Sequence, residues 1–447
     1  MSFMDKLSSG IDVVAEKVEG NKYLRAIKDA FTAYMPFIII GSFALLFNVL
    51  LTSPTTGLAQ FAPFSFLTAL APAFSTINFA TMDIMSLLIP LFLASNLAKS
   101  NNTNPLITSA VALIAYVIVV PQFFTTTVDG VQQLVRGLPA TSTNASGLFI
   151  GMILTVLVVE LFTKLSNVNA LRIKMPPSVP GGIVASFNVL LPIFVTLIIV
   201  ALTAQLFLNF TGMYMNEFIY KIVQAPLESL VQSPGGIMLL VIVSQIFWLV
   251  GIHGGLIISP IRNPLLIAAL ANNIAAVQAG NAPTNPVTMG FWMSFIVPGG
   301  AGLTLSLLIA ILIASKRDDH KAVAKVSFMP GLFGISEPVV FGLPLVLNPV
   351  FAIPFVFASS IGTAIALFFN QIGFLQPNTV DVPFGLPLGV GAFLGYGING
   401  VIVQLLIMAL GVVMYMPFVL AANKATVAVE ETETESETEK QIATEKI

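Results

Sequence analysis

Long apolar runs without charged residues dominate this sequence and restrict it to a membrane. A membrane-spanning helix needs about 20 consecutive apolar residues. Of the 447 residues, 56% are hydrophobic and 9% are charged, whereas a soluble domain carries about 25% charged residues. We therefore expect an all-α integral membrane protein with about ten transmembrane helices. The runs are Phe31–Leu51, Ile84–Leu97, Pro105–Val120, Leu148–Phe162, Gly182–Leu206, Ile237–Ile252, Ile257–Ala271, Phe291–Ala314, Leu345–Phe369 and Gly389–Leu420.

Positive charge predicts the orientation, because cytoplasmic loops carry an excess of Lys and Arg. Lys and Arg gather before the first apolar run, in residues 164–174, in residues 316–325 and near the C-terminus. We therefore expect a multi-pass protein of the cell membrane with both termini cytoplasmic and Gln122–Ser146 outside. Residues 1–29 are amphipathic and are expected to form an interfacial helix rather than a cleaved signal peptide.

Several classes of function are disfavoured by what the sequence lacks. The net charge of −2 gives no indication of nucleic-acid binding, and there is no Cys to bind a metal or act as a nucleophile. No Walker loop or metal-ligand cluster occurs, so we expect no cofactor and no metal. Energy for transport must come from an ion gradient or another protein. The last segment, residues 425–447, is rich in Glu and Thr and is expected to be a disordered acidic tail.

Glu337 lies in a run that cannot form a regular helix. Phe328–Pro344 contains three Pro and three Gly and almost no other polar side chain. Broken backbone at membrane depth is tolerated where it is buried in protein or lines a water-filled cavity. The run predicts a re-entrant hairpin with Glu337 near its tip, where a carboxylate can accept hydrogen bonds from sugar hydroxyls. The alternative is a structural carboxylate that caps nearby backbone N–H groups.

His253 stands before two glycines, and Trp248 precedes it by five residues. The glycines indicate a second break, and aromatic faces commonly stack on sugar rings. His253 and Trp248 are therefore predicted to contact substrate. A satisfied core histidine and a lipid-facing indole are the alternatives. Asn399, between glycines, is a weaker ligand candidate that turn formation also explains, and Arg262 is expected to pair with a buried carboxylate.

Together these motifs resemble the lactose/cellobiose family of phosphotransferase enzyme IIC components. Pro330–Pro344 (PGLFGISEPVVFGLP) is similar to the family signature and is followed by the Asn-Pro pair Asn348-Pro349. Trp248–Gly254 (WLVGIHG) is similar to the second motif. The resemblance runs from about Lys6 to Phe418. Secondary landmarks are Met175–Pro180, Gly299–Gly300 and Tyr415–Phe418.

The resemblance implies ten transmembrane helices, two re-entrant hairpins and a homodimer in a bacterial cell membrane. The N-terminal half, residues 1–225, would supply most of the dimer interface, and the C-terminal half, residues 226–424, would hold the sugar. Members import a disaccharide such as cellobiose, lactose or diacetylchitobiose. Cytoplasmic IIA and IIB subunits are the implied partners, and IIB phosphorylates the sugar 6-hydroxyl from a phosphocysteine. Because this chain has no Cys, IIB is expected to be a separate chain.

The family's site His and Glu map by motif onto His253 and Glu337. Both are expected to act in catalysis and in sugar binding near the 6-hydroxyl. Trp248, Phe384 and Asn399 complete the predicted sugar ligands. Phe384 occupies a segment in which many members carry a Trp, and this departure leaves the preferred disaccharide open.

Two other classes of function stay open at this point. In a proton-coupled sugar symporter, Glu337 and His253 would relay protons and free sugar would accumulate inside. A passive channel or a membrane-embedded enzyme would need no phosphoryl donor. The paired motifs favour the phosphotransferase interpretation. Whether the chain counts as an enzyme is not decided, because the phosphoryl donor would lie on another subunit.

Overall fold

The structure is a computed structural model. It describes residues 20–444, apart from 56, 129–130, 174, 177–178, 344, 347 and 349. Most of the expected N-terminal interfacial helix therefore lies outside the described residues. Side chains after Asn423 are likewise not described.

Helices account for most of the described chain, which confirms the expected all-helical membrane fold. Among the described residues, seven helical segments are long and apolar enough to cross a membrane. A pair bent by 84° at residue 233 raises the number to eight if it is one broken span. Two shorter apolar helices, Met85–Ser100 and Pro105–Val119, would bring the number to ten. The expected run Ile257–Ala271 is not among these candidate spans. The seven are Lys22–Thr52, Ala62–Asp83, Ala145–Ser166, Gly181–Thr211, Met289–Ala314, Ala352–Gln371 and Val390–Asn423.

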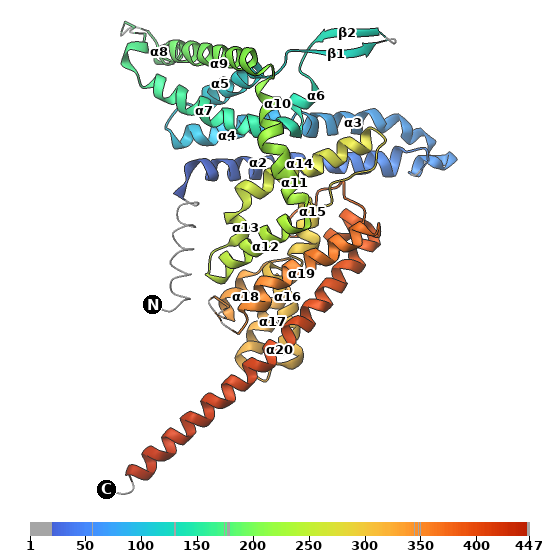
Figure 1. Ribbon diagram of the computed structural model, residues 1–447, viewed down its shortest axis with the longest axis vertical. Helices are drawn as coiled ribbons and strands as arrows, with labels where there is room; N and C mark the ends of the chain where they lie inside the picture. The colour runs from blue at the N-terminus through green and yellow to red at the C-terminus, as the bar shows by residue number, and fades with distance from the viewer. Residues whose placement is uncertain are drawn as a thin grey trace.

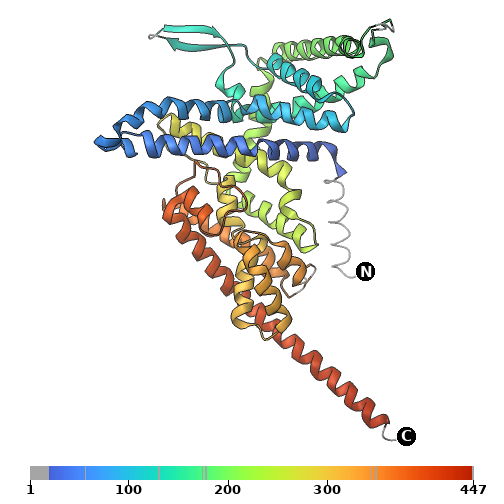
Figure 2. The same ribbon diagram turned by 180° about the vertical axis from the view of Figure 1, so that it is seen from behind.

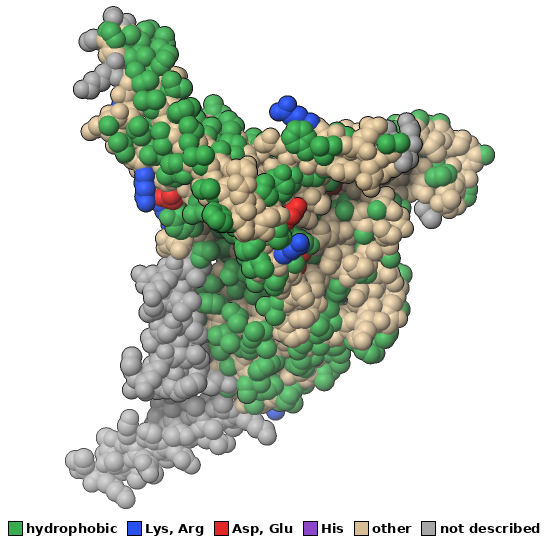
Figure 3. Space-filling model, turned by 45° about the horizontal axis from the view of Figure 1, so that its top comes forward, with side chains coloured by type: hydrophobic (Ala, Val, Ile, Leu, Met, Phe, Trp, Pro, Cys, Tyr) green, Lys and Arg blue, Asp and Glu red, His purple; other side chains and the backbone are tan. Residues whose placement is uncertain are grey.

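The N-terminal half forms stacked layers of helices (Figures 1 and 2). One segment, Ala62–Asp83, was not among the expected spans because its mean hydropathy is only 1.2. Figure 3 shows charged side chains gathered at a few places on a surface otherwise made of hydrophobic and uncharged groups. The helices are α2 (Lys22–Phe47), α3 (Ala71–Asn78), α4 (Met85–Ser100), α5 (Pro105–Val119), α6 (Ala140–Thr143), α7 (Leu148–Ser166), α8 (Gly181–Asn188), α9 (Leu190–Thr211) and α10 (Met215–Ile219).

A β-hairpin occupies the first part of the expected outer loop. Strands β1 (Phe123–Val128) and β2 (Val131–Arg136) pair antiparallel, with Phe123 opposite Arg136. The Phe, Thr and Val residues of β1 and the two Val residues of β2 favour this extended structure. The hairpin projects from the helical layers (Figure 1), and the side of the membrane on which it lies stays a prediction.

The C-terminal half is built from shorter and more frequently broken helices. Helix α20 (Val390–Thr444) is broken at Gly397, which has φ +65° and ψ −157°. It continues as a helix to Thr444, away from the bundle (Figure 1). Disorder of the tail stays a prediction. The other helices are α11 (Ala225–Gln232), α12 (Pro234–Leu249), α13 (Gly254–Ile257), α14 (Ser259–Gln278), α15 (Met289–Phe291), α16 (Thr304–Ala314), α17 (Asp318–Leu332), α18 (Glu337–Gly342) and α19 (Ala352–Gln371).

Helix α14 joins the two halves of the molecule. Its buried residues Ile267, Leu270 and Ile274 belong to the same apolar cluster as Phe31 of α2 and Leu93 of α4. The remaining core of the C-terminal half is a separate cluster that includes Trp248. The junction therefore places α2 of the N-terminal half directly beside the broken helices of the C-terminal half.

Candidate sugar-binding site

A cavity of about 440 Å³ lies where α2 meets the broken helices of the C-terminal half. Such a volume is typical of a pocket that encloses a small ligand. His253, Glu337, Trp248 and Phe384 all line it. The structure thus brings together four of the five site residues predicted from sequence, although they come from positions up to 136 residues apart.

His253 sits at the break that follows α12. Gly251 has φ +87°, which turns the chain out of the helix, and His253 then caps the short helix α13. Its Nδ1 accepts a hydrogen bond of 3.2 Å from the backbone N–H of Leu256. A side chain at Gly254 would bring its Cβ to 1.8 Å from the Ser244 carbonyl oxygen. The glycine therefore allows this turn to lie against α12 and fixes the position of the imidazole.

Glu337 begins α18 after a second break. Helix α17 ends at Leu332, and Gly334 has φ +78°. The preceding residue, Ser336, is held because its Oγ accepts a hydrogen bond of 2.7 Å from the Ala301 backbone N–H. Gly300, with φ +108°, makes room for that contact. A residue with a side chain at this position would bring its Cβ atom to 2.7 Å from Ser336 Oγ. The predicted break around Glu337 is therefore present and is tied to the Gly299–Gly300 turn.

The two breaks place the two ionisable side chains side by side. Nε2 of His253 is 3.7 Å from Oε1 of Glu337, and the side chains are 41% and 48% exposed. Because Nδ1 of His253 accepts a hydrogen bond, a neutral imidazole carries its proton on Nε2, facing the carboxylate. The separation is too long for a direct hydrogen bond. A hydroxyl oxygen to one side of the pair can lie within hydrogen-bond distance of both atoms, about 2.8 Å from each.

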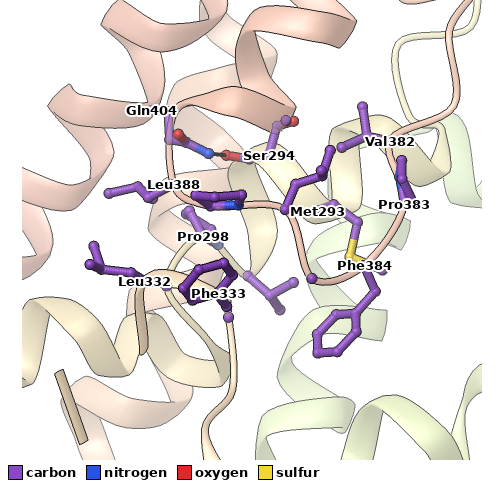
Figure 4. A pocket seen from close by; sticks show the side chains of 17 residues that line it. Met293, Ser294, Pro298, Leu332, Phe333, Val382, Pro383, Phe384, Leu388 and Gln404 are labelled. Atoms are coloured by element: carbon purple, nitrogen blue, oxygen red, sulfur yellow. Dashed lines mark hydrogen bonds between the residues drawn. The ribbon is translucent and has the colours of Figure 1, made fainter. Parts of the chain in front are cut away.

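Aromatic side chains stand beside this pair. The rings of Trp248 and His253 have centroids 4.3 Å apart, and Trp248 is only 3% exposed. Phe384 is 61% exposed and contributes to the wall from the loop before α20. It also lines a smaller neighbouring pocket, where Figure 4 shows its ring pointing away from the loop that carries Val382 and Pro383.

Asn399 and Arg262 lie differently from what the sequence indicated. Asn399 is not among the residues that line the cavity, and its amide donates a 2.9 Å hydrogen bond to the Phe374 carbonyl. The expectation that Arg262 pairs with a buried carboxylate is wrong, because no such ion pair occurs among the described residues. Arg262 lies 4.4 Å from the centre of the Trp292 ring, and it donates hydrogen bonds of 3.1 and 3.0 Å to the Asn263 side chain. Stacking and the amide together stabilise this buried guanidinium.

The wall contains residues that sequence reasoning did not select. Lys28, Asp29 and Thr32 of α2 line the cavity, although they lie just before or at the start of the first apolar run, Phe31–Leu51. Gln245 of α12 lines it as well. The sequence could have indicated Gln245 by its spacing. It precedes Trp248 by three residues, so both side chains lie on one face of the helix. No comparable signal in the sequence connects α2 to the site.

The family to which the chain belongs follows from comparison with known proteins. Residues 28–359 match the family model described as "Phosphotransferase system, EIIC". The chain belongs to this family. This EIIC is similar in structure to a solved transporter, ChbC, the IIC component from the N,N'-diacetylchitobiose-specific phosphotransferase system. The TM-score is 0.86 with 31% identity, over 95% of this chain and 99% of that one.

Relatives place this EIIC in the lactose/cellobiose group of sugar permeases. It is 31% identical to the oligo-beta-mannoside-specific EIIC component of Bacillus subtilis, over 97% of each chain. It is 28% identical to the lactose-specific EIICB component of Lacticaseibacillus casei, over 97% of this chain and 73% of that one. As a family member, this EIIC is a multi-pass sugar permease that works with IIA and IIB partners.

Proposed function

We propose that this EIIC imports a disaccharide and presents its 6-hydroxyl for phosphorylation by IIB. The observation that carries the proposal is the position of Glu337 and His253, 3.7 Å apart at a cavity of about 440 Å³. Its relatives are named as specific for oligo-β-mannosides, lactose and N,N'-diacetylchitobiose. The substrate is therefore proposed as a disaccharide of this general type.

Glu337 and His253 hold the reacting hydroxyl in this proposal. The hydroxyl donates its hydrogen to the Glu337 carboxylate and accepts a hydrogen bond from Nε2 of His253. Glu337 then acts as a general base: it takes the hydroxyl proton while the hydroxyl oxygen attacks the phosphorus of the phosphocysteine on IIB. The new O–P bond forms as the P–S bond breaks, and the cysteine of IIB leaves as a thiolate. Trp248 and Phe384 cover the apolar faces of the sugar rings. Uptake is coupled to chemistry because a charged sugar phosphate no longer suits the site.

We further propose that the N-terminal half forms a homodimer interface and that both termini are cytoplasmic. Helix α9 supports the dimer proposal, because several of its large apolar side chains are exposed at the surface instead of packed in the core. They are Phe194 (60%), Leu202 (60%), Leu206 (55%) and Phe210 (86%). The basic segments at residues 164–174 and 316–325 support the orientation.

Uptake measurements test the transport proposal. Cells that express this EIIC with its cognate IIA and IIB receive radiolabelled cellobiose, lactose or diacetylchitobiose, with and without a working phosphoenolpyruvate relay. We expect sugar 6-phosphate inside the cells only when the relay works. Free disaccharide that accumulates without the relay, and disappears when the proton gradient is dissipated, would instead establish a symporter.

A further inference from the structure

Gln245 is a buried amide without a partner at the wall of the sugar cavity. It is 0% exposed, and neither Oε1 nor Nε2 has a hydrogen-bond partner among the described residues. Buried polar groups in folded proteins are nearly always paired, and an unpaired amide destabilises the protein. The residue also lines the cavity. It lies in the wall but has no accessible surface, so its side chain must rotate to bring the amide to the space that the sugar would occupy.

Three other buried polar side chains of the same wall are already engaged. Ser259 Oγ donates to the Leu256 carbonyl at 2.7 Å. Ser336 Oγ accepts from the Ala301 N–H, and the Asn263 side chain accepts from Arg262. These contacts hold the protein together with or without sugar. Gln245 differs because its donor and acceptor capacity is unused, so rotation of its side chain toward the cavity breaks no hydrogen bond.

The position of Gln245 on α12 relates it to the rest of the site. It precedes Trp248 by three residues, so the amide and the indole lie on one face of the helix, about 4.5 Å apart along its axis. Trp248 in turn contacts His253. The amide therefore belongs to the same cavity wall as the indole and the imidazole. Glu337 and His253 hold the 6-hydroxyl in the proposed function, so the amide is left for other hydroxyl groups of the sugar.

We propose that Gln245 is a sugar-binding residue that determines specificity by hydrogen-bonding ring hydroxyls away from the 6-hydroxyl. A carboxamide offers two donors and one acceptor, which matches two neighbouring hydroxyl groups. It stays neutral, so it recognises the position of hydroxyls without competing with Glu337 for the reacting proton. The inference rests on the proposed function, because it takes the ligand of the cavity to be a disaccharide.

Affinity measurements on the purified full chain test this proposal. Cellobiose, lactose and diacetylchitobiose are titrated against the wild type, and the tightest ligand is then compared with its monodeoxy analogues. In Gln245→Met the side chain keeps its approximate size but loses both polar atoms. We expect the Kd of the parent sugar to rise about tenfold, which corresponds to about 1.4 kcal/mol. One deoxy analogue should bind weakly to the wild type and lose nothing further in Gln245→Met.

Thermal unfolding without sugar separates binding from structure. Gln245→Met removes an unpaired buried amide, so its Tm without sugar should be equal to or above that of the wild type. Gln224→Met is the matched control. Gln224 is also 0% exposed, but its Nε2 donates to the Ala145 carbonyl at 2.9 Å and to Glu228 at 2.7 Å. That variant should lose thermal stability and keep its sugar affinity.

The outcomes distinguish failure of this inference from failure of the proposed function. Equal Kd values for the wild type and Gln245→Met would overturn the role of Gln245 and leave the transport proposal standing. If the wild type binds none of the disaccharides, the proposed substrate class is wrong and the role of Gln245 falls with it. If Gln245→Met does not fold, Gln245→Asn replaces it. This variant keeps the amide but withdraws it by one methylene, and it should also bind several-fold more weakly.

Discussion

The two halves of the chain bury their apolar helices to different extents. In the N-terminal half, 11% of the most apolar stretch of Ala62–Asp83 and 18% of that of Gly181–Thr211 is buried in the protein. Ala145–Ser166 is more enclosed, at 61%. In the C-terminal half, Met289–Ala314 reaches 78%, Ala352–Gln371 reaches 50%, and Val390–Asn423 reaches 33%, which equals the value for Lys22–Thr52 of the N-terminal half. The two least buried spans thus lie in the N-terminal half, and the most buried span lies in the C-terminal half.

The difference follows from how each half satisfies the hydrogen bonds of its backbone N–H and C=O groups. Regular helices complete their own hydrogen bonds and can face lipid or another subunit. Broken helices such as α12–α13 and α17–α18 leave backbone groups and glycines that only surrounding protein can accommodate. A half that holds a polar site therefore needs more protein around its broken segments. The other half is free to supply an apolar outer face, with α2 and α14 joining the two.

The largest expected effect is on the carboxylate of the site. Glu337→Gln keeps the shape of the side chain and removes its charge and basicity. We expect the rate of sugar phosphate formation to fall by about 10²–10⁴-fold, the range typical of a positioned general base. The measurement is relay-dependent uptake with analysis of the internal product. An unchanged rate of sugar phosphorylation in Glu337→Gln would show that Glu337 is not the general base.

Glu160→Gln is the matched control in the N-terminal half. The Glu160 carboxylate accepts from Lys22 at 2.7 Å and from Asn101 at 3.0 Å, so it connects α7 to the start of α2 and the end of α4. Its loss should cost about 1 kcal/mol of stability, because the pair is partly exposed. Sugar phosphorylation per folded molecule should stay within about twofold of the wild type. A loss as large as that of Glu337→Gln would contradict the assignment of chemistry to one half.

A second prediction separates two aromatic side chains by their burial. Trp248→Ala empties a position in the core and should destabilise the protein by about 3–5 kcal/mol as well as weaken sugar binding. Phe384 is 61% exposed, so Phe384→Ala should weaken binding about tenfold at nearly unchanged Tm. Thermal unfolding and sugar titration on each variant give both quantities. If Phe384→Ala bound sugar as the wild type does, its ring would have no part in recognition.

A third prediction concerns the outward face of α9. The double variant Leu202→Ala and Phe210→Ala removes two of the most exposed apolar side chains of this helix. If α9 forms a dimer contact, self-association should weaken by about tenfold or more, since each large side chain contributes about 1.5–3 kcal/mol when buried. Analytical ultracentrifugation in detergent measures the monomer–dimer equilibrium. Sugar affinity should not change. An unaltered monomer–dimer equilibrium would show that α9 does not form the dimer interface.

The smallest effect is expected for a surface ion pair outside the site. A hydrogen bond from the Arg317 guanidinium lowers the pKa of Asp319 from 3.8 to about 2. A lowered pKa stabilises the folded protein above pH 3.8, and this contribution disappears as the pH falls toward 2. Because the Asp319 side chain is 62% exposed, solvent screening keeps the contribution below about 1 kcal/mol. Asp319→Asn should lower Tm by less than about 2 °C at pH 7, and the difference should vanish near pH 2.

Much of the site was predictable because its chemistry depends on local breaks in the helices. Proline and glycine around Glu337, and glycines after His253, interrupt helices wherever they occur in a fold. An ionisable group beside such a break must reach either water or ligand. Asn399 shows the limit of this reasoning. A polar residue in an apolar run needs a partner, but the sequence does not say whether that partner is a sugar or, as in the structure, the Phe374 carbonyl.

The sequence by itself determined that the chain is a multi-span helical membrane protein and which two segments carry its ionisable site groups. Both properties follow from residue order over short distances, through hydrophobic length and helix-breaking residues. Only the tertiary structure decided that Lys28 and Thr32 of α2 share a cavity with Glu337. It also decided that the amide of Gln245 is unpaired there. The physical reason is that contacts between distant helices depend on how whole apolar faces pack, and no local pattern encodes that choice.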